Sequence, residues 1–478
     1  MSQALLADLR TVLSSDRVLD APLSLQLYAR DASVIEGQAS AVCFPCTTAE
    51  VQAVVQVARR HGRAIVPRGS GTGLAGGAVP VSDEGQPPPV VVVTTKMDAV
   101  LEVDAEDRIA WVQPGVLNLD LSRITAVHGL HFAPDPSSQQ SCSVGGNAAN
   151  NSGGPHCLLY GVTSAHVLAI EVVLPDGSLS VLGGLEADVP GYDLRGAFVG
   201  SEGTMGIATR IAVRLTPNPP AVRTLLADFT SVEEAAAAVS GIIAAGIVPA
   251  ALEMMDAAIT SAVEDYVHAG FPRDAAAVLL VEVDGLPDGV DAAAAAIQEV
   301  VLAHGARGVR VAADLAERQL LWKGRKSAFG AIARIAPNYY LHDAVVPRTK
   351  LVGVLREIYA IAERHDLLVM NVFHAGDGNL HPLIVFDRRV PGTMERVLLA
   401  GGEIIRACVS AGGVLSGEHG IGLEKRDYMS MIFTDDDLEA QARLREVFDP
   451  EHACNPGKIL PGGSRCGDLQ SVPEGAWI

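Results

Sequence analysis

The stretch PRGSGTGLAGG (residues 67–77) follows a short apolar run at residues 64–66 and contains the pattern G-x-G-x-x-G. A dinucleotide fingerprint of this form must open a helix, but Pro80 and the prolines at 87–89 prevent one here. A P-loop is also excluded, because no Gly-Lys-Ser/Thr follows. Two interpretations remain: a flexible surface loop, or a loop whose consecutive N–H groups wrap an anion such as a pyrophosphate. The density of glycines and Arg68 just after a strand favour the anion.

The residues before this loop predict a strand, a helix and a second strand. Residues 41–45 form a short apolar run, and Thr47 follows as a candidate N-cap. Glu50, three positions later, predicts a capping box. Apolar residues then recur on one helical face across residues 51–58, and the strand at 64–66 leads into the glycine loop.

Two further glycine-rich stretches follow. PDPSSQQSCSVGGNAANNSGGP (residues 134–155) is too polar to pack as core and too long for a casual turn. Its amide and hydroxyl groups suit a flat, heteroatom-rich ligand such as a flavin ring with its ribityl chain. GSEGTMG (residues 200–206) comes after a strand-like run at 167–177 and leads into another at 207–215. Three glycine loops attached to strands indicate one large cofactor lying across this domain.

The composition limits the classes of protein that the chain can represent. Its 478 residues, 49% hydrophobic and 19% charged, predict two or three globular domains. A net charge of −20 and a pI near 5.0 argue against nucleic acid or an anionic membrane as the main partner. The seven cysteines show no repeating pattern and suit a reducing compartment. Cys43-Phe-Pro-Cys46 is interpreted as structural, because an iron–sulfur cluster needs about four thiolates.

No segment of the sequence is predicted to cross a membrane. The N-terminal residues carry charges among spaced leucines, which indicates an amphipathic helix and not a secretory signal. Residues 235–252 contain no charge, but they are alanine-rich and include Gly246 and Pro249. A span needs about 20 strongly apolar residues, so we expect a surface helix that ends at Gly246. A cytoplasmic chain is expected, which could be peripheral at the membrane through a partner.

The composition changes at Pro217-Asn-Pro-Pro220, which predicts a boundary between domains at residues 1–219 and 220–461. The predicted elements beyond it are helices at 233–245 and 291–305 and strands at 277–283 and 308–312. This alternation predicts an α+β domain with helices packed on an antiparallel sheet. Residues 462–478 are expected to form a poorly packed tail.

HAGDGNLH (residues 374–381) places two histidines around a glycine turn, which could be a metal site, a nucleotide-binding loop or a hairpin with incidental histidines. A second glycine turn, SGEHGIG (residues 416–422), follows a predicted helix at 395–411 and carries adjacent glutamate and histidine residues. Two neutral imidazoles and one carboxylate suit Zn²⁺, Mn²⁺ or Fe²⁺. Asp377, between the first two histidines, is more typical of turn chemistry than of a fourth ligand.

Taken together, these motifs resemble those of a known superfamily. PRGSGTGLAGG, PDPSSQQSCSVGGNAANNSGG and GSEGTMGI are similar to the FAD-binding domain of the vanillyl-alcohol oxidase/p-cresol methylhydroxylase (PCMH) superfamily. HAGDGNLH, GEHGIG and FDPEHACNPGKILP resemble the C-terminal domain of its FAD-linked 2-hydroxy-acid oxidase branch. That branch includes the glycolate oxidase flavoprotein subunit and the D-lactate and D-2-hydroxyglutarate dehydrogenases. The resemblance implies an α+β fold: a two-part PCMH-type FAD-binding domain, and an α+β cap domain with an antiparallel sheet whose last segment returns to the flavin.

The resemblance also implies how FAD is held, with the first glycine loop on the pyrophosphate and the second stretch along the flavin. Some members of the superfamily attach FAD covalently through a histidine in the first loop. Residues 67–77 contain no histidine, so FAD is expected to bind non-covalently. The FAD contacts implied by the matching motifs are Arg68, Gly69, Ser70, Gly71, Thr72, Gly73, Gly76, Gly77, Gly145, Gly146, Asn147, Asn151, Ser152, Gly153, Gly161, Gly206, Ile207 and Asn455.

The resemblance to D-2-hydroxyglutarate dehydrogenase assigns a metal site and a base. His374, His381 and Glu418 would be ligands of a divalent metal (Zn, Mn or Fe), and His419 would be the catalytic base. With these residues, a metal site becomes the favoured interpretation of HAGDGNLH. A non-catalytic flavin-binding subunit would be expected to lack part of this set, and here the set is complete.

Two further positions bear on the substrate. Arg325, in WKGRKSAFG (residues 322–330), matches the arginine that holds the substrate carboxylate in this family; the alternative is an arginine on the helix surface. Leu341 falls where hydroxyglutarate dehydrogenases keep a lysine for the distal carboxylate. The absence of that lysine favours a monocarboxylate such as glycolate or lactate.

The expected reaction is therefore FAD-dependent, metal-assisted oxidation of a D-2-hydroxy acid to the 2-oxo acid. The base takes the hydroxyl proton and a hydride passes to flavin N5. The alternatives are a D-2-hydroxyglutarate dehydrogenase and an oxidase that reduces O₂ directly on another alcohol. Because the sequence has no iron–sulfur pattern, electrons are expected to leave to a partner protein, a cytochrome or a quinone. Either a heteromeric oxidase complex or a homodimer is expected.

Overall fold

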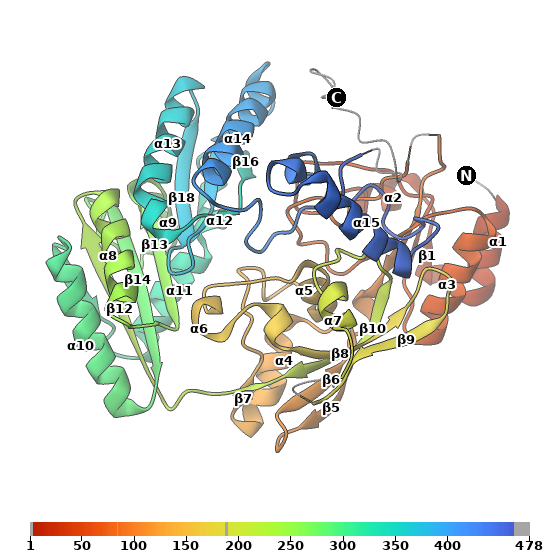
Figure 1. The fold of residues 1–478 in the computed structure, drawn as a ribbon, viewed down its shortest axis with the longest axis horizontal. Helices are drawn as coiled ribbons and strands as arrows, with labels where there is room; N and C mark the ends of the chain where they lie inside the picture. Colours follow the sequence, from red (N-terminus) through yellow and green to blue (C-terminus); the bar gives the residue numbers. More distant parts are fainter. Residues whose placement is uncertain (1–2, 84, 187–189, 463–478) are drawn as a thin grey trace.

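The strand pairings of the chain fall into two groups that meet near residues 217–221. The computed structural model describes residues 3–83, 85–186 and 190–462 (Figure 1). Strands before residue 218 form two main sheets, with orders β1-β2-β4-β3 and β5-β6-β10-β8-β9, and strands from residue 221 onward form another. We refer to residues 3–219 as the N-terminal domain and to residues 220–461 as the cap domain. Figure 1 shows the two lying side by side.

The first sheet contains the predicted strand–helix–strand unit. Its strands are β1 (Val18–Leu19), β2 (Ala41–Cys43), β3 (Ile65–Arg68) and β4 (Val90–Val93). β4 pairs in parallel with both β2 and β3, and its four valines are buried, as expected for a parallel strand covered on both faces. Helices α1 (Gln3–Val12) and α3 (Thr48–Arg60) cover one face, and α2 (Pro22–Leu27) lies against the other.

The start of α3 differs in one detail from the predicted capping box. Thr47 Oγ1 accepts a hydrogen bond from the N–H of Glu50 at 3.2 Å, as expected. The Glu50 carboxylate, however, accepts from the N–H of Cys46 at 2.7 Å and binds Arg17 through both of its oxygens. Arg17 also donates to Cys46 Sγ, and Cys43 is buried in β2, so both cysteines of the C-x-x-C pair make packing contacts.

The second sheet positions the other two glycine stretches. Its strands are β5 (Val100–Asp104), β6 (Ile109–Val112), β8 (Val167–Val173), β9 (Leu179–Gly183) and β10 (Ile207–Arg214). Neighbouring strands run antiparallel. Helices α4 (Asn118–Thr125), α5 (Val144–Asn150) and α7 (Leu194–Phe198) pack against this sheet. The second glycine stretch contains α5, and the third ends where β10 begins, so the sheet brings both stretches together.

The cap domain is an antiparallel sheet with helices on both faces. Its strands are β12 (Ala221–Phe229), β13 (Ala251–Asp256), β14 (Ala277–Gly285), β15 (Gly308–Val311), β16 (Asn338–Leu341), β17 (Ala344–Val345), β18 (Leu368–His374), β19 (Asn379–Leu380) and β20 (Pro382–Phe386). One face carries α8 (Val232–Ala244), α10 (Pro287–Ala303), α13 (Leu351–Arg364) and α14 (Thr393–Ser410). The other carries α9 (Ala257–Val267), α11 (Leu315–Lys326) and α12 (Ala328–Ile332).

This arrangement confirms the predicted antiparallel sheet packed with helices. Alternate residues of β12 point to opposite faces: Leu225 and Ala227 enter one core and Leu226 the other. The alanine-rich segment forms α8, which ends at Ala244, and the turn at Gly246 precedes β13. None of the helices within residues 3–83, 85–186 and 190–462 combines the length and apolar character needed to cross a membrane.

The C-terminal segment crosses back to the N-terminal domain. Helix α15 (Asp435–Phe448) lies against that domain in Figure 1, and Phe448 joins the core of its second sheet. The backbone of Cys454 then pairs with that of Ile65 of β3 in an isolated parallel β-bridge. Lys458 Nζ donates to Val79 O at 2.9 Å. The part of the expected tail after residue 462 lies outside the described residues.

A buried polar network joins the two domains. His156 of the N-terminal domain contacts Asp135 through Nδ1 at 2.9 Å and Glu282 of the cap through Nε2 at 3.3 Å. Lys326 of the cap contacts Asp135 at 3.2 Å. Burial lowers the pKa of His156, but the two carboxylates, Asp135 above all, outweigh it and raise the pKa to about 10. His156 is therefore charged at neutral pH and links the domains electrostatically.

Replacing His156 with glutamine should reduce stability most at low pH. A folded-state pKa of about 10, against an ordinary value near 6.5, stabilises the folded chain fully below about pH 6.5. This contribution disappears as the pH rises towards the folded-state pKa. The measurement is the free energy of urea unfolding of both chains, with FAD present, from about pH 6 to pH 10. His128→Gln, at an exposed position, is the control. A wild-type advantage over His156→Gln that is independent of pH would contradict the prediction.

Candidate active site

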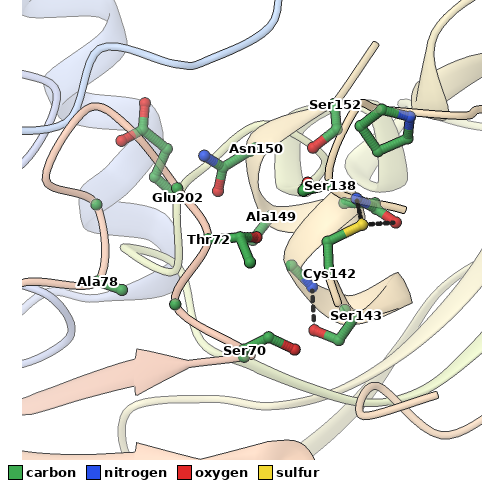
Figure 2. Close-up of a pocket in the computed structure, with 18 of the residues that line it drawn as sticks. Ser70, Thr72, Ala78, Ser138, Cys142, Ser143, Ala149, Asn150, Ser152 and Glu202 are labelled. Carbon is green, nitrogen blue, oxygen red and sulfur yellow. Dashed lines mark hydrogen bonds between the residues drawn. The ribbon is translucent and has the colours of Figure 1, made fainter. Parts of the chain in front are cut away.

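A cavity of about 510 Å³ lies between the glycine loops of the N-terminal domain and the histidine turns of the cap. Residues of all three glycine stretches line it, together with His381, Glu418 and His419. Figure 2 shows the first loop, with Ser70 and Thr72, beside helix α5, which carries Ala149 and Asn150. Loops from both domains therefore share one cavity.

The first loop bends tightly around its own arginine. Gly71 has a φ of +74°, and a Cβ there would lie 2.1 Å from the Arg68 guanidinium, so the turn requires glycine. Arg68 stacks over the ring of Tyr28 at 5.5 Å. A Cβ at Gly69 would meet Ser143 Oγ at 2.4 Å, so the first loop approaches α5 closely. Arg68 and most of the glycine loop line the cavity, so a cation and a glycine-rich backbone lie where an anion-binding loop would need them.

Most of the predicted FAD contacts line the cavity. They are Arg68, Gly69, Ser70, Gly71, Thr72, Gly73, Gly77, Gly145, Gly146, Asn147, Ser152, Gly206 and Ile207. The other five, which do not line it in the described structure, are Gly76, Asn151, Gly153, Gly161 and Asn455.

The five residues outside the cavity shape the loops around it. Asn455 Nδ2 donates to Gly77 O at 2.8 Å and to Glu202 O at 2.6 Å, and so ties the first loop to the third. Asn151 ends α5 in the left-handed conformation, and its Oδ1 accepts from the N–H of Ser164. Gly76 and Gly161 also have positive φ, and Gly153 packs closely on Glu418.

Several cavity residues were not predicted from the sequence. Glu202 accepts a hydrogen bond from the N–H of Ile421 at 2.6 Å, and burial raises its pKa to about 7. Asn150 Nδ2 donates to His419 O at 3.1 Å. Glu202 and Asn150 lie inside the glycine-rich motifs, so the sequence marked the stretches that contain them but not the two residues themselves. Lys326 and Tyr339 also line the cavity, and nothing in the sequence alone marked them.

The two histidine motifs meet at one point. HAGDGNLH forms a hairpin in which His374, at the end of β18, pairs with Asn379 of β19. Glu418 Oε1 lies 3.2 Å from His374 Nε2 and 3.4 Å from His381 Nε2. The structure thus brings His374, His381 and Glu418 together, with one ligand atom of each within 4.8 Å of the others.

Asp343 holds the second histidine turn and was missed by the sequence analysis. Its Oδ2 accepts hydrogen bonds from Ser416 Oγ and from the backbone N–H groups of residues 417, 418 and 419, at 2.6 to 3.2 Å. Lys425 Nζ donates to its backbone oxygen at 2.9 Å. Although burial raises the pKa of Asp343, His419 and Lys425 lower it well below its usual value. One carboxylate therefore fixes the turn that presents Glu418 and His419.

The donor set fits a divalent cation. Asp343 Oδ1 and His381 Nε2 are buried without a hydrogen-bond partner, although the two atoms lie only 3.4 Å apart. Although burial lowers the pKa of His374, Glu253 and Glu418 raise it well above its usual value, so this pocket favours positive charge. Imidazole and carboxylate are ligands that Zn²⁺, Mn²⁺ and Fe²⁺ accept. A second set, Asp343, His381 and His419, lies within the same 4.8 Å limit.

His419 lies against this cluster and on the cavity. Its ring stacks on that of His381 with centroids 5.0 Å apart, and its Nε2 lies 3.8 Å from Glu418 Oε1. Burial lowers the pKa of His419 to about 4, against the attraction of Asp343. The ring is therefore neutral at neutral pH, the form in which one imidazole nitrogen has a free lone pair.

Arg325 and Leu341, which were expected to contact or select the substrate, do not line the cavity in the described structure. Arg325 is buried, with 1% of its surface exposed, and its Nη2 lies 2.5 Å from Glu253 Oε2. It is not among the described residues that line the cavity, and it is not on the helix surface either. Leu341 is buried in the core of the cap and pairs with Leu383, also away from the cavity. Asp377 is partly buried in its turn.

The chain matches known families over most of its length. Residues 218–459 match the family described as FAD linked oxidases, C-terminal domain, and residues 39–183 match an FAD binding domain. Glycolate oxidase subunit GlcD of Escherichia coli (strain K12) is 47% identical over 431 residues, which are 90% of this chain and 85% of that protein. D-lactate dehydrogenase of Anaerostipes hadrus is 33% identical over 426 residues, 86% of this chain and 88% of that one.

A solved structure shares the fold. The crystal structure of p-cresol methylhydroxylase with substrate bound has a TM-score of 0.80 at 17% identity, covering 95% of this chain and 96% of that one. This likeness confirms the expected PCMH-type fold. Together with the two domain matches and the 47% identity, it shows that the chain belongs to the FAD-linked oxidase family and is an FAD-dependent oxidoreductase.

Proposed function

We propose that the chain oxidises a D-2-hydroxy acid of the glycolate or D-lactate type to the 2-oxo acid, with help from a divalent metal. The observation that carries the proposal is the shared cavity. FAD-binding glycine loops line one part of it, and His381, Glu418 and His419 line another. Relatives named glycolate oxidase subunit and D-lactate dehydrogenase support the substrate class.

The chain's own residues would bind the cofactors as follows. The cavity-lining glycine loops would hold FAD non-covalently, and His374, His381 and Glu418 would hold the metal. When bound, FAD supplies a hydride acceptor at flavin N5, and a divalent cation supplies a Lewis acid that lowers the pKa of the substrate hydroxyl.

His419 would act as the base. Its turn is fixed by Asp343, and its main-chain oxygen accepts from Asn150 of the N-terminal domain. These two contacts hold the main chain of His419, and its ring, which lines the cavity, would take the hydroxyl proton while the hydride leaves Cα.

The substrate carboxylate requires a cation in the cavity. Arg325 is engaged by Glu253, whereas Lys326, the next residue, lines the cavity and is partly exposed there. We therefore assign the carboxylate contact to Lys326 instead of Arg325. Asp135, which contacts Lys326 at 3.2 Å, would hold the ammonium group in place until substrate arrives.

Glycolate or D-lactate should bleach the flavin under anaerobic conditions, and D-2-hydroxyglutarate should do so much more slowly. The measurement is flavin absorbance after mixing with each acid, followed by admission of air. Electrons are proposed to leave to a partner protein, a cytochrome or a quinone, so reoxidation by air should be slow and an artificial acceptor should speed it. Rapid reoxidation by air would instead indicate an O₂-reducing oxidase. A flavin that none of the three acids bleaches would contradict the proposal.

His419→Ala and Lys326→Met should affect different kinetic constants. Loss of the base should lower kcat by about 10²- to 10⁴-fold, while FAD stays bound. Loss of the ammonium group should mainly raise KM for the acid, because it removes a contact made in the ground state as well. Steady-state kinetics and FAD content test both variants, and Lys323→Met, on the same helix but exposed, is the control. Near wild-type turnover by His419→Ala would show that another group is the base.

Removal of the metal should abolish turnover without releasing FAD. His374→Ala and His381→Ala should each lose the ion, because each removes one of three protein ligands. Elemental analysis of the FAD-loaded chains should find about one ion per wild-type chain and far less in the two variants; the exposed His128→Ala should resemble wild type. Wild-type protein that contains no metal and keeps full activity after chelator treatment would exclude a metal-assisted reaction.

A further inference from the structure

We propose that Glu253 and Arg325 are positioning residues: a buried ion pair that orients His374 so that its Nε2 faces the metal. The inference rests on the proposed function, because it concerns the same metal site. It gives Arg325 a role that requires no contact with the substrate.

The register of the cap sheet places Glu253 directly opposite His374. β13 and β18 run antiparallel, and the two residues are cross-strand partners. Glu253 Oε1 lies 2.7 Å from His374 Nδ1, and both side chains are almost fully buried. Directly opposed residues point to the same face of a sheet, so the backbone itself imposes this contact.

That contact determines which nitrogen of His374 can bind a cation. A carboxylate at Nδ1 accepts the Nδ1 proton, which leaves the lone pair of the neutral ring on Nε2. Nε2 is the atom that lies 3.2 Å from Glu418 and belongs to the candidate ligand set. Glu253 therefore fixes both the tautomer and the plane of the ring.

Arg325 supplies what Glu253 needs in order to remain in place. A carboxylate with 1% exposure is costly to bury unless a cation pairs with it. Arg325 Nη2 lies 2.5 Å from Glu253 Oε2, the oxygen that His374 does not use. A guanidinium keeps its charge when buried, whereas a lysine ammonium loses its proton more readily there, so arginine suits this position.

The same helix offers a matched control. Arg318, two turns before Arg325 on α11, contacts Glu282 at 2.7 Å, and Glu282 contacts His156 at 3.3 Å. This is also an arginine–carboxylate–histidine chain on the same sheet, but His156 belongs to neither candidate metal set. Removing Arg318 perturbs a similar ion pair without touching the metal site.

The test is metal affinity in FAD-loaded chains, measured with Zn²⁺ and Co²⁺ in competition with a chromophoric chelator. Glu253→Gln and Arg325→Met should each weaken binding by about 10- to 100-fold, and Arg325→Lys should recover part of the loss. The visible spectrum of bound Co²⁺, which reports ligand geometry, should change in Glu253→Gln. Arg318→Met should keep the affinity and the Co²⁺ spectrum of the wild type.

The outcomes separate this inference from the proposed function. If the wild type binds Co²⁺ and both Glu253→Gln and Arg325→Met bind it equally well with the same spectrum, the positioning role is wrong and the metal site stands. If the wild type binds neither ion, the metal site is wrong and the positioning role falls with it. Equal losses in Arg325→Met and Arg318→Met would show a general effect of weakening α11, and would also overturn the inference.

Discussion

Three buried carboxylates lie around the two histidines of one hairpin, and this concentration of negative charge constrains the rest of the site. Glu253, Asp343 and Glu418 are each largely or fully buried, and each would be unfavourable there without compensation. Arg325 compensates Glu253, and Lys425 with a ring of backbone N–H groups compensates Asp343. Within the described part of the chain, the groups that pair with Glu418 are imidazoles, which compensate its charge only when they carry a proton or share a cation with it. Glu253 and Asp343 thus each have a fixed cation as a partner, whereas the contacts of Glu418 with cationic groups depend on the histidines.

The N-terminal domain closes this site as well as binding the cofactor. Glu202 of the third glycine stretch accepts a hydrogen bond from the N–H of Ile421. Asn150 of the second stretch donates one to the main-chain oxygen of His419. Asn455 then joins the first loop to the third from the returning C-terminal segment. Glu202 and Asn150 therefore line the cavity and also hold the second histidine turn. Because these contacts come from separate loops of the N-terminal domain, both domains contribute to the position of His419, the proposed base.

Local patterns in the sequence predicted the parts of this structure that depend on local chemistry. The glycine loops, the helix after Thr47, the alanine-rich helices and the HAGDGNLH hairpin all follow from spacing, caps and turn residues. The candidate metal set followed from two short motifs and a family resemblance. Asp343 could not be found in this way, because its side chain accepts hydrogen bonds from residues 73 or more positions along the chain. The partner of Arg325 was missed for the same reason: pairing between β13 and β18 decides it, and a single sequence does not reveal that register.

Helix α11 carries arginines that serve both the contact between the domains and the histidine cluster, and neither HAGDGNLH nor SGEHGIG indicates this. Arg318 and Arg325 are seven residues apart, so both side chains leave the same face of the helix. Their partners also share a face of the sheet, since Glu282 pairs with Ala251 and Glu253 lies two residues further along that strand. The indole of Trp322, between the two arginines, donates to Glu282 at 2.6 Å. One helix therefore supplies the arginine beside Glu282, which contacts His156 of the N-terminal domain, and the arginine beside Glu253, which contacts His374. Each arginine contacts its own carboxylate, so the two ion pairs are separate, and loss of Arg318 leaves the contact of Arg325 with Glu253 at the histidine cluster in place.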